Sequence, residues 1–169
     1  NMDRTPEMYL IQNANGAGAG NNGVLTLYTI TGRIGFETVN QRGNMIIPGA
    51  WEDFPISGSA DFAPQLGLPV LIQNNDARMQ NAVLRNGTLW CTHHIFLPAG
   101  GGRRTAVQWF QILPFGPGFL FQRGRIDDPT GQRFFAFPSI AVNRLNDVLI
   151  GYSTFSTNQF ASAGYSYRR

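Results

Sequence analysis

The stretch MQNAVLRNGTLWCTHHIF, residues 79–96, decides the fold class of this chain. At its centre lies the dipeptide Asn86-Gly87, and the segments on both sides are rich in apolar and β-branched residues. Asn-Gly between two such segments is the strongest short-range signal for a β-hairpin, because both residues tolerate the positive φ angles of a two-residue turn. We therefore predict paired antiparallel strands near residues 79–84 and 88–96.

The hairpin extends into a predicted four-stranded sheet. Residues 105–113 form another run of strand formers, which ends at Pro114, and residues 119–125 follow the Gly-Pro-Gly turn at 116–118. Apolar runs bounded by turn residues are typical of β-strands. Four consecutive antiparallel strands over residues 79–126 correspond to the composition of one β-propeller blade.

Other parts of the chain repeat pieces of this unit. Gln41-Arg42-Gly43 recurs as Gln122-Arg123-Gly124, and the turn segment Arg85-Asn86-Gly87 has a counterpart in Leu145-Asn146-Asp147. Recurring segments indicate stacked copies of one supersecondary unit. We therefore expect an all-β chain of about three blades made of four-stranded antiparallel sheets, which is too few to close a propeller of about four to eight blades.

The predicted organisation is a single β-propeller-like segment, residues 1–169. It would consist of a partial blade at 7–48, a long connection at 49–78, the full blade at 79–126 and a second partial blade at 133–169. Such an arc would be a fragment of a longer protein or a subunit completed by other chains, and a β-sandwich is the alternative architecture. In an open arc the first and last blades should expose apolar faces.

Composition narrows the possible partners. All 13 basic residues of the 169-residue chain are arginine, and they are dispersed in a chain of net charge +3, which argues against nucleic-acid binding. No apolar run reaches the roughly 18 residues of a membrane-spanning helix, so no membrane span is expected. A single cysteine, Cys91, excludes an internal disulfide and a multi-cysteine zinc site.

Five segments together carry a resemblance to a known class of proteins: residues 76–81, 85–90, 106–109, 137–143 and 146–153. They resemble propeller-type repeats of large secreted or surface-exposed bacterial proteins, and the resemblance covers residues 8–169. It implies an extracellular or cell-surface location in a bacterium. Since these proteins are mostly of unassigned function, it implies no catalytic residue.

Cys91-Thr92-His93-His94 is the most reactive cluster in the sequence. In a strand, Cys91 and His93 share a face, so they are weak candidates for metal ligands. Zinc requires about four ligands and the chain has no second cysteine and no third histidine, so no cofactor is expected. The internal repeat aligns Cys91 with Gly151 and His93 with Ser153, which favours a small, packed, structural residue at position 91.

The long connection contributes the candidate binding residues Trp51, Glu52, Asp53 and Asp61. Long irregular segments in compact domains are often functional, and an exposed Trp51 there would indicate a contact site. Paired carboxylates roughly 5–10 Å apart could also support glycoside hydrolysis, and the further carboxylates for such a pair are Asp76 and Asp127-Asp128. Asp127-Asp128-Pro129-Thr130-Gly131 is more typical of a β-turn.

Three hypotheses about function remain. The leading one is a non-enzymatic interaction module that binds protein or glycan partners at the cell surface or docks on a larger assembly, its partners being other protein chains or the missing remainder of the same protein. The alternatives are a glycan-active hydrolase that uses carboxylates and a structural β-protein that polymerises through its open edges. Whether the chain is an enzyme stays open, and the absence of a catalytic motif favours binding.

Overall fold

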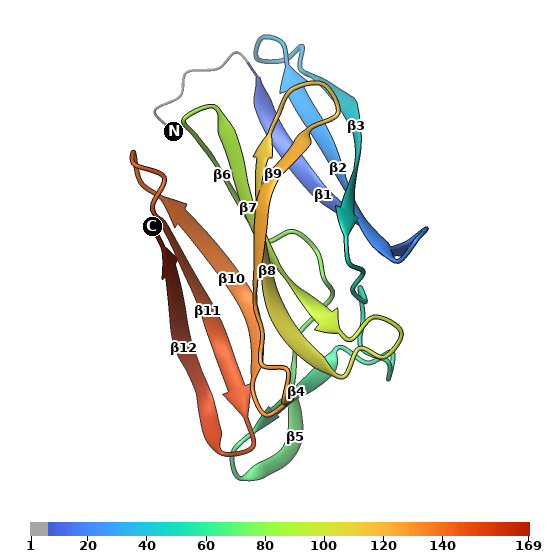
Figure 1. The fold of residues 1–169 in the computed structure, drawn as a ribbon, viewed down its shortest axis with the longest axis vertical. Coiled ribbons are helices and arrows are strands. Elements are labelled where there is room, and N and C mark those ends of the chain that lie inside the picture. Colours follow the sequence, from blue (N-terminus) through green and yellow to red (C-terminus); the bar gives the residue numbers. More distant parts are fainter. Residues whose placement is uncertain (1–6) are drawn as a thin grey trace.

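The computed structural model describes residues 7–169 as twelve β-strands without a helix, in four antiparallel sheets of which none closes on itself, which confirms the all-β prediction. The first sheet holds β1 (Met8–Gly18), β2 (Asn22–Thr31) and β3 (Thr38–Pro48). A separate hairpin holds β4 (Asp61–Gln65) and β5 (Leu68–Gln73). The central sheet holds β6 (Asn81–Arg85), β7 (Thr88–Leu97), β8 (Arg104–Leu113) and β9 (Phe119–Ile126). The last sheet holds β10 (Phe134–Val142), β11 (Val148–Ser156) and β12 (Gln159–Arg168) (Figure 1).

The four predicted strands of residues 79–126 form one antiparallel sheet in sequence order, as expected. Asn86 and Gly87 make the turn with φ angles of 49° and 72°, and Arg85 pairs with Thr88 across it. Asn and Gly are the residues that adopt this left-handed conformation at least cost, which explains why the hairpin was readable from the sequence. The first strand begins at Asn81, two residues later than predicted.

The repeated Gln-Arg-Gly tripeptide has a structural meaning. Gly43 on β3 pairs with Leu27 on β2, and Gly124 on β9 pairs with Trp109 on β8. A Cβ atom at Gly124 would lie 2.5 Å from the Trp109 ring, so a glycine is required where the indole crosses the neighbouring strand. In both sheets the tripeptide therefore ends on a glycine opposite a large side chain of the preceding strand.

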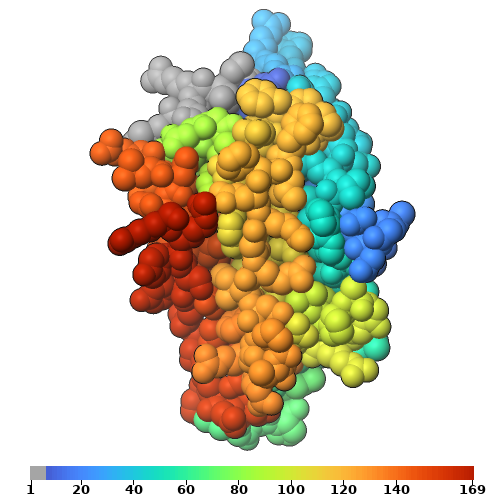
Figure 2. Space-filling model, viewed as in Figure 1, coloured from blue at the N-terminus to red at the C-terminus, as the bar shows by residue number. Residues whose placement is uncertain are grey.

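The central sheet lies between the first and last sheets (Figure 1). Its two middle strands, β7 and β8, are buried on both faces. On β7, Leu89, Cys91 and Ile95 pack toward the first sheet, whereas Trp90 packs toward the last sheet. Side chains alternate between the two faces of a strand, and here both faces are covered, so β7 is buried along almost its whole length. In Figure 2 the segment around β9 runs along the visible face between the first sheet and the last sheet.

The long connection contains a hairpin that the sequence did not reveal. Only residues 70–72 had the composition of a strand, yet β4 and β5 pair within this connection, and the backbone N–H of Asn74 donates to the Ala60 carbonyl at 2.7 Å to close the hairpin base. β4 includes Pro64, which lacks a donor and is tolerated only where no ladder bond is needed. Phe62 and Ala63 of β4 pack with Phe134 and Phe155 of the last sheet.

The repeat that relates Arg85-Asn86-Gly87 to Leu145-Asn146-Asp147 brings its two copies into contact. The side-chain amide of Asn86 donates from Nδ2 to Oδ1 of Asn146 at 2.9 Å, so the two corresponding turns contact each other. Trp90 and Ile150, which also correspond in the repeat, lie in the same apolar cluster between the central and last sheets. The two copies of this repeat, one in the central sheet and one in the last sheet, therefore contact each other directly.

Candidate functional site

Trp51 lies in the core and is not an exposed contact residue. Its side chain is 0% exposed and packs between the first and central sheets, with its ring centroid 5.5 Å from that of His93. Cβ atoms built at Gly16 and Gly23 would lie 2.5 Å and 1.9 Å from atoms of Trp51, so these glycines of the first hairpin form the slot that receives the indole. This burial removes Trp51 from the candidate binding residues.

Asp53 holds the segment after Trp51 against the first sheet. Its carboxylate accepts a hydrogen bond from Asn13 Nδ2 at 2.7 Å and from the backbone N–H of Gly16 at 3.1 Å. The same Asn13 amide donates to the Ala77 carbonyl at 2.9 Å, and the backbone N–H of Ala77 donates to the Asp53 carbonyl at 2.9 Å. Asp53 thus connects three segments that are far apart in the sequence.

A polar cavity of about 460 Å³ opens beside this junction and brings two candidate carboxylates together. Asp53, Asp76 and Arg78 line it, with Asn13 and the half-exposed ring of Phe54. Both Arg78 Nε and Arg78 Nη2 donate to the Asp76 carboxylate, at 2.5 Å and 2.7 Å, and this pairing holds the pKa of Asp76 below its usual value. Both carboxylates therefore have donors already in place. Neither Asn13 nor Arg78 was predicted as part of a site, because single Asn and Arg residues carry no pattern.

Glu52 and Asp61 do not line this cavity. Glu52 faces a neighbouring cavity of about 410 Å³ that Asp53 also lines, and its carboxylate accepts the backbone N–H of Gly100 at 2.5 Å. Its backbone pairs with Phe96 of β7 in both directions. Asp61 begins β4 and is exposed. Of the four predicted binding residues, the structure therefore brings together only Glu52 and Asp53 at the surface.

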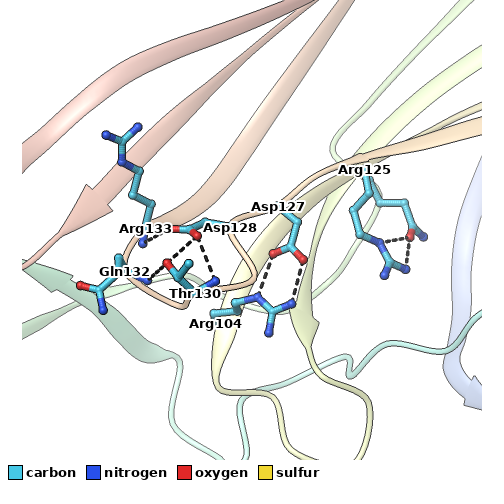
Figure 3. A network of polar contacts seen from close by, with 8 residues as sticks. Arg104, Arg125, Asp127, Asp128, Thr130, Gln132 and Arg133 are labelled. Atoms are coloured by element: carbon cyan, nitrogen blue, oxygen red, sulfur yellow. Dashed lines mark hydrogen bonds and ion pairs between the residues drawn. The ribbon is translucent and has the colours of Figure 1, made fainter.

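Asp127 and Asp128 have separate structural roles (Figure 3). Asp127 accepts two hydrogen bonds from Arg104, from Nε at 2.8 Å and from Nη2 at 2.7 Å. Asp128 accepts the backbone N–H groups of Thr130 and Arg133, at 3.0 Å and 2.9 Å. The backbone N–H of Gly131 also donates to the Asp128 carbonyl, which confirms the predicted turn.

The Cys91 and His93 side chains are fully buried, as a structural role predicts for Cys91. Burial raises the pKa of the Cys91 thiol. His93 Nδ1 donates to the Ala77 carbonyl at 2.8 Å, and burial lowers the pKa values of His93 and His94 to about 4. Within residues 7–169 no group of three or more His, Cys, Asp or Glu side chains is placed to hold a metal ion.

The repeat-based explanation for Cys91 needs correction. Cys91 packs inside the cluster between the first and central sheets, whereas a side chain added at Gly151 would meet nothing within 4 Å. Gly151 pairs with Tyr165, which is 71% exposed. The two positions correspond in sequence but differ in surroundings, so close packing explains the small residue at 91 and does not explain the glycine at 151.

Two sheet faces carry exposed apolar rows. On the first sheet, alternate positions face away from the core because Leu25 and Leu27 face into it. The exposed apolar side chains at these outward positions are Met8, Leu10, Val39 and Ile46. On the last sheet Ile150 faces inward, and the exposed side chains of the opposite face are Leu149, Tyr165 and Tyr167. The cross-strand rows that contain these residues include no charged side chain.

Comparisons with protein-family models, with curated proteins and with solved structures gave no match to this chain. In the part of the chain that the structure describes, no helix has the length and apolar character needed to cross a membrane.

Proposed function

We propose that this chain is a non-enzymatic interaction module whose two outer sheet faces pack against further β-sheets. Those sheets would come from other protein chains or from the remainder of the same protein. The observation that carries this proposal is the pair of exposed apolar rows on the outer faces of the first and last sheets. Exposed apolar surface that gathers on one face is typical of protein interaction sites.

The central sheet illustrates what such a face does when it is covered. Leu89 and Ile112 are a cross-strand pair on its face toward the first sheet, and both are buried. Leu149 and Tyr167 are a cross-strand pair on the outer face of the last sheet, and they are 49% and 71% exposed. Full burial of one such aliphatic side chain contributes about 1.5–3 kcal/mol, so a partner sheet would be stabilised by several of these contacts.

We further propose that the three sheets are consecutive blades of a propeller arc completed by its partners. The matched registers of Leu27 with Gly43 and of Trp109 with Gly124 support equivalent sheets. The resemblance to repeats of secreted or surface-exposed bacterial proteins supports a location outside the cell.

A glycan partner is the second candidate, and the polar cavity at Asp53 favours it. Carboxylate, guanidinium and amide groups line that cavity beside the exposed ring of Phe54, a combination suited to the hydroxyl groups and apolar faces of sugars. Glycoside hydrolysis is less well supported, because a general acid needs a raised pKa and Arg78 lowers that of Asp76. Weaker binding of a neutral oligosaccharide by Phe54→Ala, with Leu145→Ala as control, would support glycan recognition.

Association of the purified chain tests the interaction module. We expect light scattering to show concentration-dependent association, which Val39→Glu on the first sheet and Leu149→Glu on the last sheet should each reduce. Leu145→Glu is the matched control, because Leu145 is 69% exposed in the turn before β11 and lies outside both faces. Two results would contradict the proposal: a chain that stays monomeric at all concentrations, or a Leu145→Glu variant whose association is reduced as much as that of the two face variants.

A further inference from the structure

A small cavity on the flank of the central sheet is lined by two arginines. It measures about 280 Å³, and Gln108, Arg123, Gly124 and Arg125 surround it. Arg123 and Arg125 are two positions apart on β9, so their side chains stand on one face of the sheet. Opposite them on β8 are Phe110 and Gln108, and Phe110 packs toward the first sheet. The cavity therefore lies where the edge strand β9 meets the margin of the first sheet.

The positive charge of this cavity has no carboxylate partner among residues 7–169. Asp127 lies two residues after Arg125, but both of its carboxylate oxygens accept hydrogen bonds from Arg104 (Figure 3). Arg125 instead donates from Nε and Nη2 to the neutral Gln108 Oε1, at 3.0 Å and 2.6 Å. The ion pairs of the described chain include neither Arg123 nor Arg125. Desolvation and the neighbouring Arg123 charge lower the pKa of Arg125, and the Asp127 charge offsets this lowering only in part.

Gln108 fixes the geometry of the cavity wall. Its side chain is 1% exposed, and its oxygen is held by Arg125, which leaves the amide nitrogen Nε2 without a partner among the described residues. On the opposite side the Arg123 guanidinium lies over Gly49, 3.7 Å from the position that a Cβ atom would take there. The Arg125 guanidinium is thus oriented by a buried amide, and the Arg123 guanidinium lies beside a glycine that directly follows β3.

We propose that the Arg123–Arg125 cavity binds a dianionic oxyanion group, phosphate or sulfate, carried by a ligand of this protein. A guanidinium presents a planar fork of N–H donors that matches two oxygens of such a group. Two guanidinium groups that line one small cavity match a doubly charged group better than a neutral sugar hydroxyl does. The ligand would then supply the direct ion-pair partner that neither arginine has among the described residues.

Isothermal titration calorimetry on the whole chain tests this site, with inorganic phosphate and inorganic sulfate as probes at constant ionic strength. We expect saturable binding of at least one probe and, for Arg123→Gln, affinity lower by roughly tenfold or more, the range of one charge-assisted hydrogen-bonded contact. Arg123→Lys should also weaken binding, because it keeps the charge but loses the fork. Arg103→Gln, which removes an exposed arginine outside the cavity, should bind as the unmodified chain does.

Two outcomes would overturn the proposal: the absence of saturable binding, or equal affinities of Arg123→Gln and Arg103→Gln for both probes. Circular dichroism of both variants checks folding, which we expect to be unchanged because the Arg123 side chain makes no hydrogen bond within residues 7–169. Titration with glucose 6-phosphate and galactose 6-sulfate then separates the two sources of the oxyanion. Tighter binding of one ester than of its inorganic ion identifies the carrier class.

Discussion

The central sheet and the last sheet begin from similar hairpins but end in different environments. On β7 both faces are covered, and even Thr92, His93 and His94 are buried. On β11 and β12 only one face is covered, and Leu149, Tyr165 and Tyr167 remain exposed. The difference shows that strand sequence specifies pairing within a sheet, whereas the fate of each face depends on what packs against it.

Polar residues in the central sheet illustrate the consequence of double burial. Thr92 donates from Oγ1 to the Gln108 carbonyl at 2.9 Å, and Gln111 donates from Nε2 to Thr88 Oγ1 at 3.0 Å. Most buried polar groups in proteins are hydrogen-bonded, and these two contacts offset part of the cost of burying polar side chains in an apolar layer.

Thiol labelling should give the largest contrast between the two sheets. Cys91 is fully buried and its pKa is raised, so labelling of the native chain requires unfolding or local opening. A cysteine at the open position, Gly151→Cys in a Cys91→Ala background, should react faster by roughly a thousandfold or more, given folding free energies of about 5–15 kcal/mol. Thiol labelling quenched at a series of times and analysed by mass spectrometry measures both rates. Rapid native labelling of Cys91 would show that the central sheet is open on one face.

Trp51→Ala should cause the largest loss of stability. The indole joins the first and central sheets and is 0% exposed, so its removal should cost about 3–5 kcal/mol. Tyr165→Ala on the outer face of the last sheet should change the free energy of unfolding by less than about 0.5 kcal/mol. Urea unfolding followed by circular dichroism, at a concentration where the chain is monomeric, checks both values. Similar losses in the two variants would mean that the outer face is already packed.

Acid should weaken the central sheet through its histidines. The folded-state pKa of His93 and His94 is about 4, below the ordinary 6.5, so the unfolded chain binds protons more readily between these values. The contribution of these two histidines to the free energy of unfolding is therefore fully present above about pH 6.5. It falls as the pH decreases toward 4, by about 2 kcal/mol or more. Urea midpoints measured across this range test the effect. A His94→Gln variant should show a shallower dependence, and an unchanged slope would show that His94 does not contribute to it.

A pair of glycine substitutions should give the smallest contrast. Gly23→Ala places a methyl group against the Trp51 ring and should cost about 1–3 kcal/mol. Gly151→Ala meets open space in a strand interior and should be neutral or stabilising by about 0.5 kcal/mol. Thermal unfolding of the two variants under identical conditions measures the difference. Equal melting temperatures would indicate that Trp51 moves readily out of its slot.

Local signals made the strands predictable, and distant contacts made the site difficult to predict. Asn86-Gly87 fixes a hairpin from two residues, and the four-stranded central sheet followed from it. The burial of Trp51 depends on Gly16 and Gly23, which lie in another hairpin, and no periodicity in residues 49–56 indicates it. Asp53 was predicted as a binding residue. Its hydrogen bond from Asn13 could not be predicted, because it depends on the packing of β1 beside residue 53 in the folded chain.

Exposed apolar faces on the first and last sheets were expected from the sequence, but which face of a given strand is covered was not. Cys91 and Gly151 align in the repeat, yet whether either face is covered depends on the neighbouring sheet and not on the strand itself. The hairpin β4–β5 was missed because Pro64 weakens its strand pattern, although its apolar residues pack on the last sheet.

Each strand of this chain pairs only with strands adjacent to it in sequence. Sheets built in this way close short loops, which cost little chain entropy before their contacts form. The first sheet can therefore assemble while later residues are still being made, followed by the central and last sheets in turn. The packing of Trp51 between the first and central sheets then joins strand pairs that can form independently of one another.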